Sequence, residues 1–352
     1  MADLYPVYMD IGGVRTKVTA YKDIEGVRTL ISSAESTSEV LPTDCLTFSS
    51  AEAFTIATKN ARKNWDGALY YSTDTTTWSE WDGTTAISSE GHDGEQRIYM
   101  RGSGNSKITG YHLTAGTRWT LTGSDIACYG NIENLLDYET VANGEHPTMA
   151  KYCYYYMFSN CTSLVSAPEL PATTLTNAYC YQYMFSNCTS LVSAPELPAT
   201  TLSDSCYNYM FHGCTSLVNA PKLPATTLTN SCYNGMFGGC TSLATAPELP
   251  ATTLAKICYK AMFSDCTSLT SVPELPSTVL AEKCYWSMFE GCTNIMLSTT
   301  QTGEYTTEYR IPTSGTGATA TDALLDMFTD TGGTFTGTPT INTTYYTGNT
   351  VV

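Results

Sequence analysis

Six consecutive copies of one pattern occupy the middle of the chain and constrain its fold more than any other feature. The pattern reads Cys-Tyr-x-x-Met-Phe-x-x-Cys-Thr, and five of the copies continue into a Pro-x-Leu-Pro segment. The first cysteine recurs after 27 and then four times after 26 residues, at Cys153, Cys180, Cys206, Cys232, Cys258 and Cys284. Repeats of about 20 to 29 residues are typical of leucine-rich arrays. The sequence therefore predicts a solenoid of stacked units.

A single copy cannot fold alone. Burying Met, Phe and two Leu contributes roughly 6 to 12 kcal/mol, whereas ordering the backbone costs roughly 1 to 2 kcal/mol per residue. Stability must come from stacking on neighbouring copies and from capped ends. We expect a structural core at Cys153, Met157, Phe158, Cys161 and Leu164 of the first copy and at Cys180, Met184, Phe185, Cys188 and Leu191 of the second.

The repeat pattern predicts a short helix, a short strand and an extended exit in each copy. Cys153, Met157 and Cys161 fall on one helical face at i, i+4 and i+8. In the second copy we expect the helix at Cys180–Cys188, the strand at Leu191–Ala194 and an exit at Pro195–Pro198, because proline cannot donate to a β-ladder.

Fourteen cysteines could indicate disulfides, but twelve stand at fixed places in the repeats. On a helix the two cysteines of a copy lie about 12 Å apart, and neighbouring helices pack about 8 to 10 Å apart. A disulfide needs Cα atoms within roughly 4.4 to 6.8 Å. We interpret the cysteines as reduced, buried small hydrophobes. A zinc ladder is the alternative, although Cys-x7-Cys does not bring ligands together as Cys-x2-Cys does.

The chain divides into three predicted parts, a mixed α/β and β architecture. Residues 1–44 are an expected β anchor or oligomerisation region, because Val7 to Val18 alternates around Gly12-Gly13 as a β-hairpin does. Residues 45–125 are an expected β-sandwich, with short strand candidates separated by Gly, Asp and Ser turns. Residues 126–352 are the solenoid, with an N-cap at 126–152, six repeats at 153–297 and a C-terminal cap at 298–352.

Positions that vary between copies are expected to face solvent. One series begins with Tyr155 and ends with Trp286; another begins with Tyr156, Tyr183 and Tyr209. Aromatic side chains at a repeat spacing can stack on sugars or anchor a protein partner. The candidate binding residues are therefore Tyr155, Tyr156, Tyr183, Tyr209 and Trp286. The alternative is that tyrosine covers the next helix and that the exit series of Glu169, Glu196, Lys222, Glu248 and Glu274 keeps the array soluble.

The charge of the chain excludes several partners. A formal net charge of -16 with only 17 basic residues repels phosphate backbones and anionic lipid, so we expect no nucleic acid partner. The first residues have no basic region and no apolar stretch of the kind found in signal peptides. We also expect no membrane insertion, because no run of about 18 apolar residues occurs.

Motifs of enzyme chemistry are not found, and no cofactor or metal is implied. Carboxylates gather at Asp74, Glu80, Asp82, Asp93 and Glu95, but no motif fixes the two-carboxylate geometry of a glycosidase. A metal at His92 to Glu95, or calcium between Asp74 and Asp82, is the sharper alternative to acidic turns. Tyr71 to Trp78 is similar to an Asp-box hairpin, which elsewhere staples a turn.

The repeats resemble the BspA-like leucine-rich repeats of bacterial surface proteins, in which Phe-x-x-Cys-x-x-Leu precedes a short strand and proline. The resemblance covers roughly residues 128 to 340. The form Cys-Tyr-x-x-Met-Phe-x-x-Cys-Thr-Ser-Leu-x-x-Ala-Pro-x-Leu-Pro looks like the variant of gut Bacteroidales and of head or tail appendages of their phages. The resemblance implies recognition without catalysis.

The expected function is that of a phage virion appendage. It would attach to other virion proteins through its N-terminal region, form a homo-oligomer, with a trimer as the guess, and adhere to a host-surface or mucosal glycan or protein through the solenoid. A virion protein is released by lysis and needs no export signal, which favours a virion surface location. The alternatives are a BspA-type bacterial cell-surface adhesin and a purely structural capsid or tail decoration.

Overall fold

The computed structural model describes the strands before residue 42 by their backbone and then residues 42–92, 94–111, 118–311, 320–348 and 350–352. The described residues are mostly β-strand and turn, with one α-helix, α1 (Asn134–Ala142). The chain forms two compact units, residues 1–43 and 44–352. In the first unit β1 (Val7–Ile11) pairs antiparallel with β2 (Val14–Val18), and β3 (Tyr21–Ile24) with β4 (Val27–Leu30).

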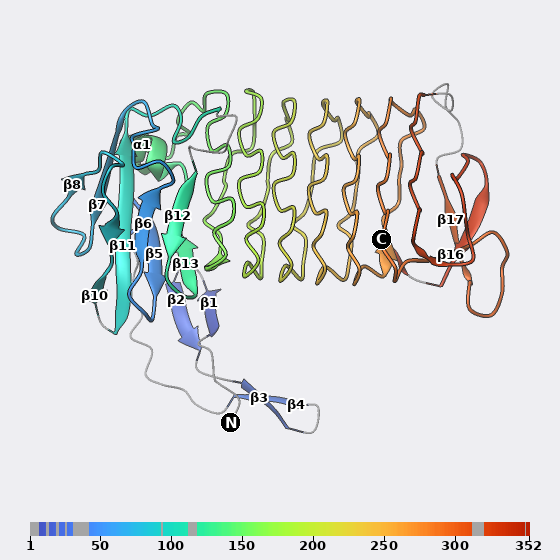
Figure 1. The fold of residues 1–352 in the computed structure, drawn as a ribbon, viewed down its shortest axis with the longest axis horizontal. Helices are drawn as coiled ribbons and strands as arrows, with labels where there is room; N and C mark the ends of the chain where they lie inside the picture. The colour runs from blue at the N-terminus through green and yellow to red at the C-terminus, as the bar shows by residue number, and fades with distance from the viewer. Residues whose placement is uncertain are drawn as a thin grey trace. The chain divides into compact units, whose positions relative to one another are not determined.

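Two sheets form the first part of the second unit (Figure 1). A seven-stranded sheet has the order β14-β13-β5-β11-β7-β8, with β10 beside β11, and a three-stranded sheet has the order β12-β6-β9. The strands are β5 (Leu46–Ser50), β6 (Thr55–Thr58), β7 (Ala68–Ser72), β8 (Ser79–Glu80), β9 (Ile87–Ser88), β10 (Glu90–His92), β11 (Glu95–Ser103), β12 (Trp119–Thr122), β13 (Ile126–Tyr129) and β14 (Leu164–Ser166).

Large aromatic side chains form the core of these sheets. The ring of Trp81 stacks on Trp65 at 5.0 Å between centroids and meets Trp119 edge-on at 5.4 Å. Trp119, which is fully buried, also contacts Phe48 and Phe158. Because Phe158 belongs to the first repeat, the aromatic core of the sheets continues without interruption into the repeat array.

Backbone hydrogen bonds also join the sheets to the array. Strand β13 pairs antiparallel with β5 and parallel with β14, which belongs to the first copy. The Trp119 N–H donates to the carbonyl of Met157 at 2.7 Å, and the Ile108 N–H donates to that of Cys153 at 2.9 Å. The sheets therefore cover the first copy, as a capping unit must.

The helix expected at Cys153–Cys161 is wrong, and so are its equivalents in the later copies. This segment is a series of turns in which every fourth residue has a positive φ: Tyr152 (63°), Tyr156 (58°) and Asn160 (63°). The strand expected at Leu191–Ala194 is reduced to an isolated parallel bridge at Ser193.

Alternate N–H groups of each turn segment have different partners. The N–H of Met157 donates within the copy, to the carbonyl of Tyr154 at 3.1 Å. The N–H groups of Tyr156 and Phe158 donate to the next copy, to Gln182 and Met184 at 3.0 and 2.9 Å. An α-helix would use all these donors internally. The turns instead give half of them to the neighbouring copy, so stacking satisfies the backbone.

Ile257 occupies one of the positive-φ positions, with a φ of 61°. A β-branched residue there is strained, because the left-handed conformation costs an L-residue roughly 1 to 2 kcal/mol and asparagine tolerates it better. We expect Ile257→Asn to raise the free energy of unfolding by about 1 kcal/mol, measured by urea denaturation. Unchanged or lower stability would show that packing of the half-buried isoleucine outweighs its backbone strain.

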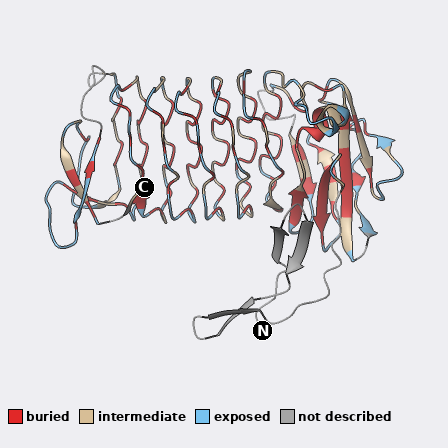
Figure 2. Cartoon of the chain, turned by 180° about the vertical axis from the view of Figure 1, so that it is seen from behind, coloured by how far each residue is buried: buried red, intermediate tan, exposed pale blue. Residues whose placement is uncertain are grey.

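Two columns of stacked aromatic rings fill the array. The tyrosine column has centroid distances of 5.5 to 6.0 Å and interplanar angles of 1 to 9°. It consists of Tyr154, Tyr181, Tyr207, Tyr233, Tyr259 and Tyr285. The phenylalanine column has distances of 5.3 to 5.8 Å and consists of Phe158, Phe185, Phe211, Phe237, Phe263, Phe289 and Phe328. Figure 2 shows buried and exposed residues alternating along each copy.

All fourteen cysteines are free and buried, although the helical argument for this was wrong. The second cysteine of a copy bonds to the copy before it: the Cys240 thiol donates to the Phe211 carbonyl at 3.1 Å, and the Cys266 thiol to that of Phe237 at 3.0 Å. Cysteine thus acts as a small core residue with a weak donor. The remaining predicted core residues, from Met157 to Leu191, are also fully buried.

The last cysteine-containing copy is followed by a seventh turn segment, residues 320–330. The N–H groups of Tyr285 and Ser287 donate to the carbonyls of Ala323 and Leu325, at 3.0 and 2.9 Å. The remaining strands are β15 (Ser271–Val272), β16 (Met296–Ser298), β17 (Thr307–Arg310), β18 (Gly332–Gly333), β19 (Thr344–Thr347) and β20 (Thr350–Val351). Four of them form one sheet, ordered β17-β19-β16-β18, and β20 pairs with β15.

Candidate binding surface

Seven tyrosines gather on the first three copies and form what we call the tyrosine patch. Its members are Tyr111, Tyr152, Tyr155, Tyr156, Tyr179, Tyr183 and Tyr209. One ladder stacks Tyr152 on Tyr179 at 4.7 Å between centroids. The other stacks Tyr156, Tyr183 and Tyr209 at 4.4 and 5.0 Å. All five ladder residues are half-buried, so part of each ring remains open to solvent.

Tyr155 contacts a ring of each ladder from a more buried position. Its ring meets Tyr152 edge-on at 5.3 Å and Tyr156 edge-on at 4.5 Å. Only 8% of Tyr155 is exposed, and Tyr111, which is 55% exposed, lies 6.0 Å from it. The expectation that the Tyr155 series faces solvent is therefore wrong at Tyr155 and also at Asn208, its equivalent in copy three, which is 6% exposed. Tyr155 supports the patch, because neighbouring rings cover it.

The turn conformation explains why the ladders form. Tyr156, Tyr183 and Tyr209 all occupy positive-φ positions, with φ of 58, 56 and 53°, and such positions recur in each copy. Copy four has Gly235 here, and a Cβ built on that glycine would lie 2.4 Å from the Tyr209 ring. The ladder therefore ends at Tyr209, which extends over the glycine.

Tyrosine at these positions is costly. A left-handed non-glycine residue costs roughly 1 to 2 kcal/mol, and Gly235 shows that the array accepts glycine at the same place. Residues held in such conformations cluster at functional sites. This conformation, however, belongs to the turn of every copy, because Ala261 and Ser287 share it with φ of 50 and 54°. What distinguishes the first three copies is that tyrosine stands where later copies have glycine, alanine or serine.

Three buried or half-buried phenols of the patch have raised pKa values, and a lysine lies beside two of its rings. Burial raises the pKa of the Tyr155 and Tyr156 phenols to about 12, and it raises the pKa of Tyr183 well above 10. The Lys151 ammonium lies 5.1 Å from the ring centroids of both Tyr152 and Tyr179. The patch therefore offers flat apolar faces, neutral hydroxyl groups and one positive charge.

The structure brings four of the five predicted binding residues together and leaves Trp286 apart. Trp286 lies in copy six, where the Lys260 ammonium is 3.9 Å from its ring centroid. Its indole N–H donates to Asp326 at 3.4 Å. Sequence reasoning missed Tyr152 and Tyr179. The sequence does contain a sign of this second ladder, because both tyrosines immediately precede the first cysteine of their copies.

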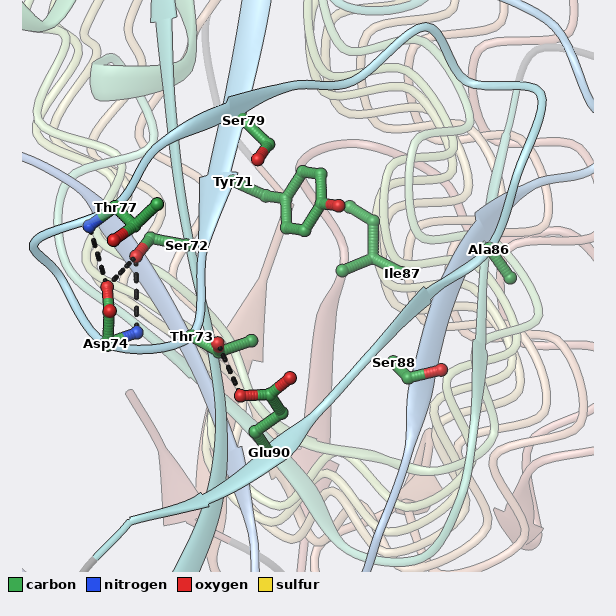
Figure 3. A pocket seen from close by; sticks show the side chains of 10 residues that line it. All are labelled: Tyr71, Ser72, Thr73, Asp74, Thr77, Ser79, Ala86, Ile87, Ser88 and Glu90. Atoms are coloured by element: carbon green, nitrogen blue, oxygen red, sulfur yellow. Dashed lines mark hydrogen bonds between the residues drawn. The ribbon is translucent and has the colours of Figure 1, made fainter.

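A polar groove of about 460 Å³ lies beside the hairpin of β7 and β8 (Figure 3). It is lined by Tyr71, Ser72, Thr73, Asp74, Thr77, Ser79, Ala86, Ile87, Ser88 and Glu90. Thr73 donates to Glu90 at 2.9 Å. Asp74 accepts the N–H groups of Thr76 and Thr77 at 2.9 and 2.8 Å, and these bonds lower the pKa of its carboxyl. Asp74 thus staples its own turn, as the Asp-box likeness implied.

The other acidic candidates do not combine into a site. Asp82 accepts the N–H and hydroxyl of Thr84, both at 2.8 Å, and Glu95 pairs with Arg97 at 3.4 Å. Asp93 lies outside the described residues. Within the described ranges, no three His, Cys, Asp or Glu side chains are grouped so that they could hold a metal ion.

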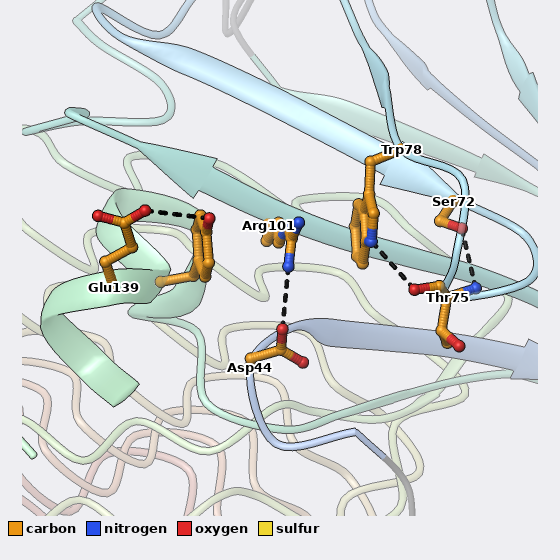
Figure 4. A network of polar contacts seen from close by, with 7 residues as sticks. Asp44, Ser72, Thr75, Trp78, Arg101 and Glu139 are labelled. Carbon is orange, nitrogen blue, oxygen red and sulfur yellow. Dashed lines mark hydrogen bonds and ion pairs between the residues drawn. The ribbon is translucent and has the colours of Figure 1, made fainter. Parts of the chain in front are cut away.

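Arg101 of β11 lies at the centre of a network of contacts (Figure 4). Its guanidinium lies between two aromatic rings, 4.0 Å from the centroid of Trp78 and 4.2 Å from that of Tyr138. It also pairs with Asp44 at 2.9 Å. One face of the Trp78 ring is therefore already occupied by Arg101.

The comparisons with known proteins agree with the stacked copies. A family model described as "BspA type Leucine rich repeat region" matches residues 137–270 and 181–308, with six copies. The repeats are therefore similar to BspA-type leucine-rich repeats, a type that is typical of surface-associated, adhesin-like proteins. No curated protein and no solved structure matches the chain. Among the described residues, no helix has the length and apolar character needed to cross a membrane.

Proposed function

We propose that this protein is a non-enzymatic adhesion protein and that its tyrosine patch binds a glycan on a host surface or in mucus. The observation that carries the proposal is the tyrosine ladder at positive-φ positions, where Gly235 shows that no side chain is needed. A sugar presents apolar C–H faces and hydroxyl groups. Half-buried tyrosine rings match both, because each ring has an apolar face and a hydrogen-bonding tip.

The proposed architecture is a solenoid at residues 126–352, preceded by a β-sandwich at residues 45–125. In this arrangement the sandwich is a spacer and the solenoid displays the patch. Support comes from the stacking bonds between copies and from the aromatic core that continues from Trp119 to Phe158. A continuous core joins the spacer and the display surface in one compact unit, which favours binding because little ordering is needed.

The proposed location is a phage virion, with residues 1–44 as the attachment region and a homotrimer as the assembly. This rests on the resemblance of the repeat to the form found in phages of gut Bacteroidales. Detection of the chain by mass spectrometry in purified particles tests it. Recovery only from the envelope of a bacterium would favour the alternative of a bacterial surface adhesin.

The binding test compares the full chain with a Tyr156→Ala, Tyr183→Ala, Tyr209→Ala variant on a glycan array. Alanine is acceptable at these positions, because Ala261 occupies the equivalent place in copy five with a φ of 50°. Aromatic anchors contribute about 1 to 2 kcal/mol each, so we expect the variant to bind at least tenfold more weakly. A Trp286→Ala variant, which changes an aromatic residue outside the patch, serves as the control and should bind as the wild type does.

Two outcomes would contradict the proposal. Equal binding by the wild type and the triple variant would place the glycan site elsewhere, with the groove beside Thr73 and Glu90 as the next candidate. No binding of any glycan by the wild type would favour a purely structural decoration of the particle.

A further inference from the structure

The last turn segment, residues 320–330, has no following copy among the described residues to accept its outward N–H groups. In copies one to six, alternate N–H groups donate to the following copy. The N–H groups of Lys283, Tyr285 and Ser287 in copy six donate to the carbonyls of Thr321, Ala323 and Leu325. In the earlier copies, the residue that follows each acceptor is the donor to the next copy. The equivalent donors of the last segment are therefore Asp322, Leu324 and Asp326. In the part of the chain that the structure describes, no acceptor bonds to these three N–H groups.

An open groove of about 440 Å³ lies at this end of the array. It is lined by Ala320, Asp322, Ala323, Leu324, Leu325, Thr338, Pro339, Thr340 and Ile341. The C-terminal strands cover the end of the phenylalanine column, where Phe328 is 2% exposed and contacts Tyr309 and Phe335. They leave Leu324, which follows Tyr285 in the tyrosine column, only half-buried.

We propose that this groove binds a polypeptide segment of a partner, which continues the stack by one further strand of chain. Its carbonyl groups, at every second residue, would accept the N–H groups of Asp322, Leu324 and Asp326. A small apolar side chain would pack between Leu324 and Ile341. This is the mode of strand addition to an unpaired edge, and it repeats the contact that already joins each copy to the next.

The one charged residue among the described residues that line the groove, Asp322, favours a basic segment. Asp322 and Asp326 occupy two successive positive-φ positions, with φ of 52 and 54°. Lys283 lies 3.8 Å from the Asp322 carboxylate and balances it in part, and the Trp286 indole donates to Asp326. Asp322 is exposed despite its contact with Lys283. A lysine or arginine in the partner segment would therefore form an ion pair with its carboxylate.

Two arrays of this chain do not pair end to end at the groove. If the last segments of two arrays met, the N–H groups of one would face the N–H groups of the other, and two donors form no hydrogen bond. At the other end of the array, the carbonyls of Cys153 and Met157 are occupied by Ile108 and Trp119. The occupant must therefore be a segment with free carbonyl groups.

The probe is a synthetic peptide with the sequence of residues 320–330 in which the three aspartates are replaced by lysine. Its binding to the full chain is measured by fluorescence anisotropy, together with hydrogen exchange of the amides of residues 322–326. Without peptide, these amides should exchange faster than their equivalents in residues 283–287. With peptide, we expect saturable binding and slower exchange at residues 322–326.

Two variants carry the same change of charge. Lysine is acceptable at residue 322, because Lys283 occupies the equivalent position in copy six with a φ of 56°. We expect Asp322→Lys to weaken binding of the peptide at least tenfold. Glu248→Lys is the control, because Lys222 occupies the equivalent exposed position in copy three, and its binding should match the wild type. An Ile341→Gln variant tests the apolar wall and should also bind more weakly.

The proposal is overturned if the peptide does not bind at millimolar concentration or if Asp322→Lys binds it as well as Glu248→Lys does. It is also overturned if sedimentation shows self-association that Asp322→Lys abolishes, since that result would assign the groove to a second copy. Neither result bears on the tyrosine patch, which lies on the first three copies.

Discussion

The protein should unfold within about one pH unit once the pH exceeds 9, the ordinary pKa of a cysteine thiol. Burial raises the pKa of all fourteen thiols above that value, to about 12 at Cys161 and Cys214 for example. The buried phenols behave alike: the pKa of Tyr233 is raised well above 10. Between the two pKa values a thiol ionises in the unfolded chain but stays protonated in the folded one.

The sign of the effect follows from proton linkage. Above pH 9 the unfolded state binds fewer protons than the folded state, so the free energy of unfolding falls as the pH rises. Each group contributes about 1.4 kcal/mol per pH unit. Fourteen thiols together remove on the order of 20 kcal/mol per pH unit, more than the roughly 5 to 15 kcal/mol that stabilises a typical protein. Below the ordinary thiol pKa the full stability remains.

The measurement is a pH titration under reducing conditions that records circular dichroism and ultraviolet thiolate absorbance together. Thiolate absorbance should appear only as the dichroism of the fold disappears, and both should reverse on return to neutral pH. Thiols that ionise near pH 9 while the dichroism stays unchanged would contradict the burial of the cysteine columns.

Phe237→Ala should lower the free energy of unfolding by about 4 to 8 kcal/mol. Phe237 is fully buried and stacks on Phe211 at 5.8 Å and on Phe263 at 5.7 Å, in the middle of the column. Truncating a buried phenylalanine costs about 3 to 5 kcal/mol, and each lost ring pair adds about 0.5 to 1.5 kcal/mol. Because each copy contacts only its neighbours, the cavity weakens both halves of the array.

Urea denaturation of the wild type and of two variants measures this effect. Tyr209→Ala is the control, because that ring is half-buried and stacks on a neighbour on one side only, and it should lose less than 2 kcal/mol. A loss below about 2 kcal/mol for Phe237→Ala would mean that the column is not a continuous core.

The four-residue period explains both what the sequence predicts and where the prediction is wrong. Cys153, Met157 and Cys161 each follow a positive-φ residue, so the turns bring them to the same side after every four residues. A helix repeats its faces at nearly the same interval. The buried residues were therefore predictable from spacing, but the spacing alone could not distinguish turns from a helix. The positive φ at Tyr156 has no sequence mark, whereas asparagine at Asn160 and glycine at its equivalents Gly213, Gly239 and Gly291 were a signal.

The candidate site was only partly predictable. Repeat spacing identified Tyr156, Tyr183 and Tyr209, because variable positions at equivalent places stack when copies stack. It could not show that Tyr155 is covered, since Tyr111 comes from a loop before the repeats. The open groove beside Leu324 depends on which part of the last segment the C-terminal strands cover, and no repeat pattern determines that contact.

The most direct test of the account is equilibrium binding of the full chain to intact host cells, with the wild type compared with the Tyr156→Ala, Tyr183→Ala, Tyr209→Ala variant. Both proteins should show the same circular dichroism. The account predicts saturable binding by the wild type and a loss of at least tenfold in affinity for the variant. Binding of equal affinity by the two proteins would contradict the assignment of recognition to the tyrosine patch.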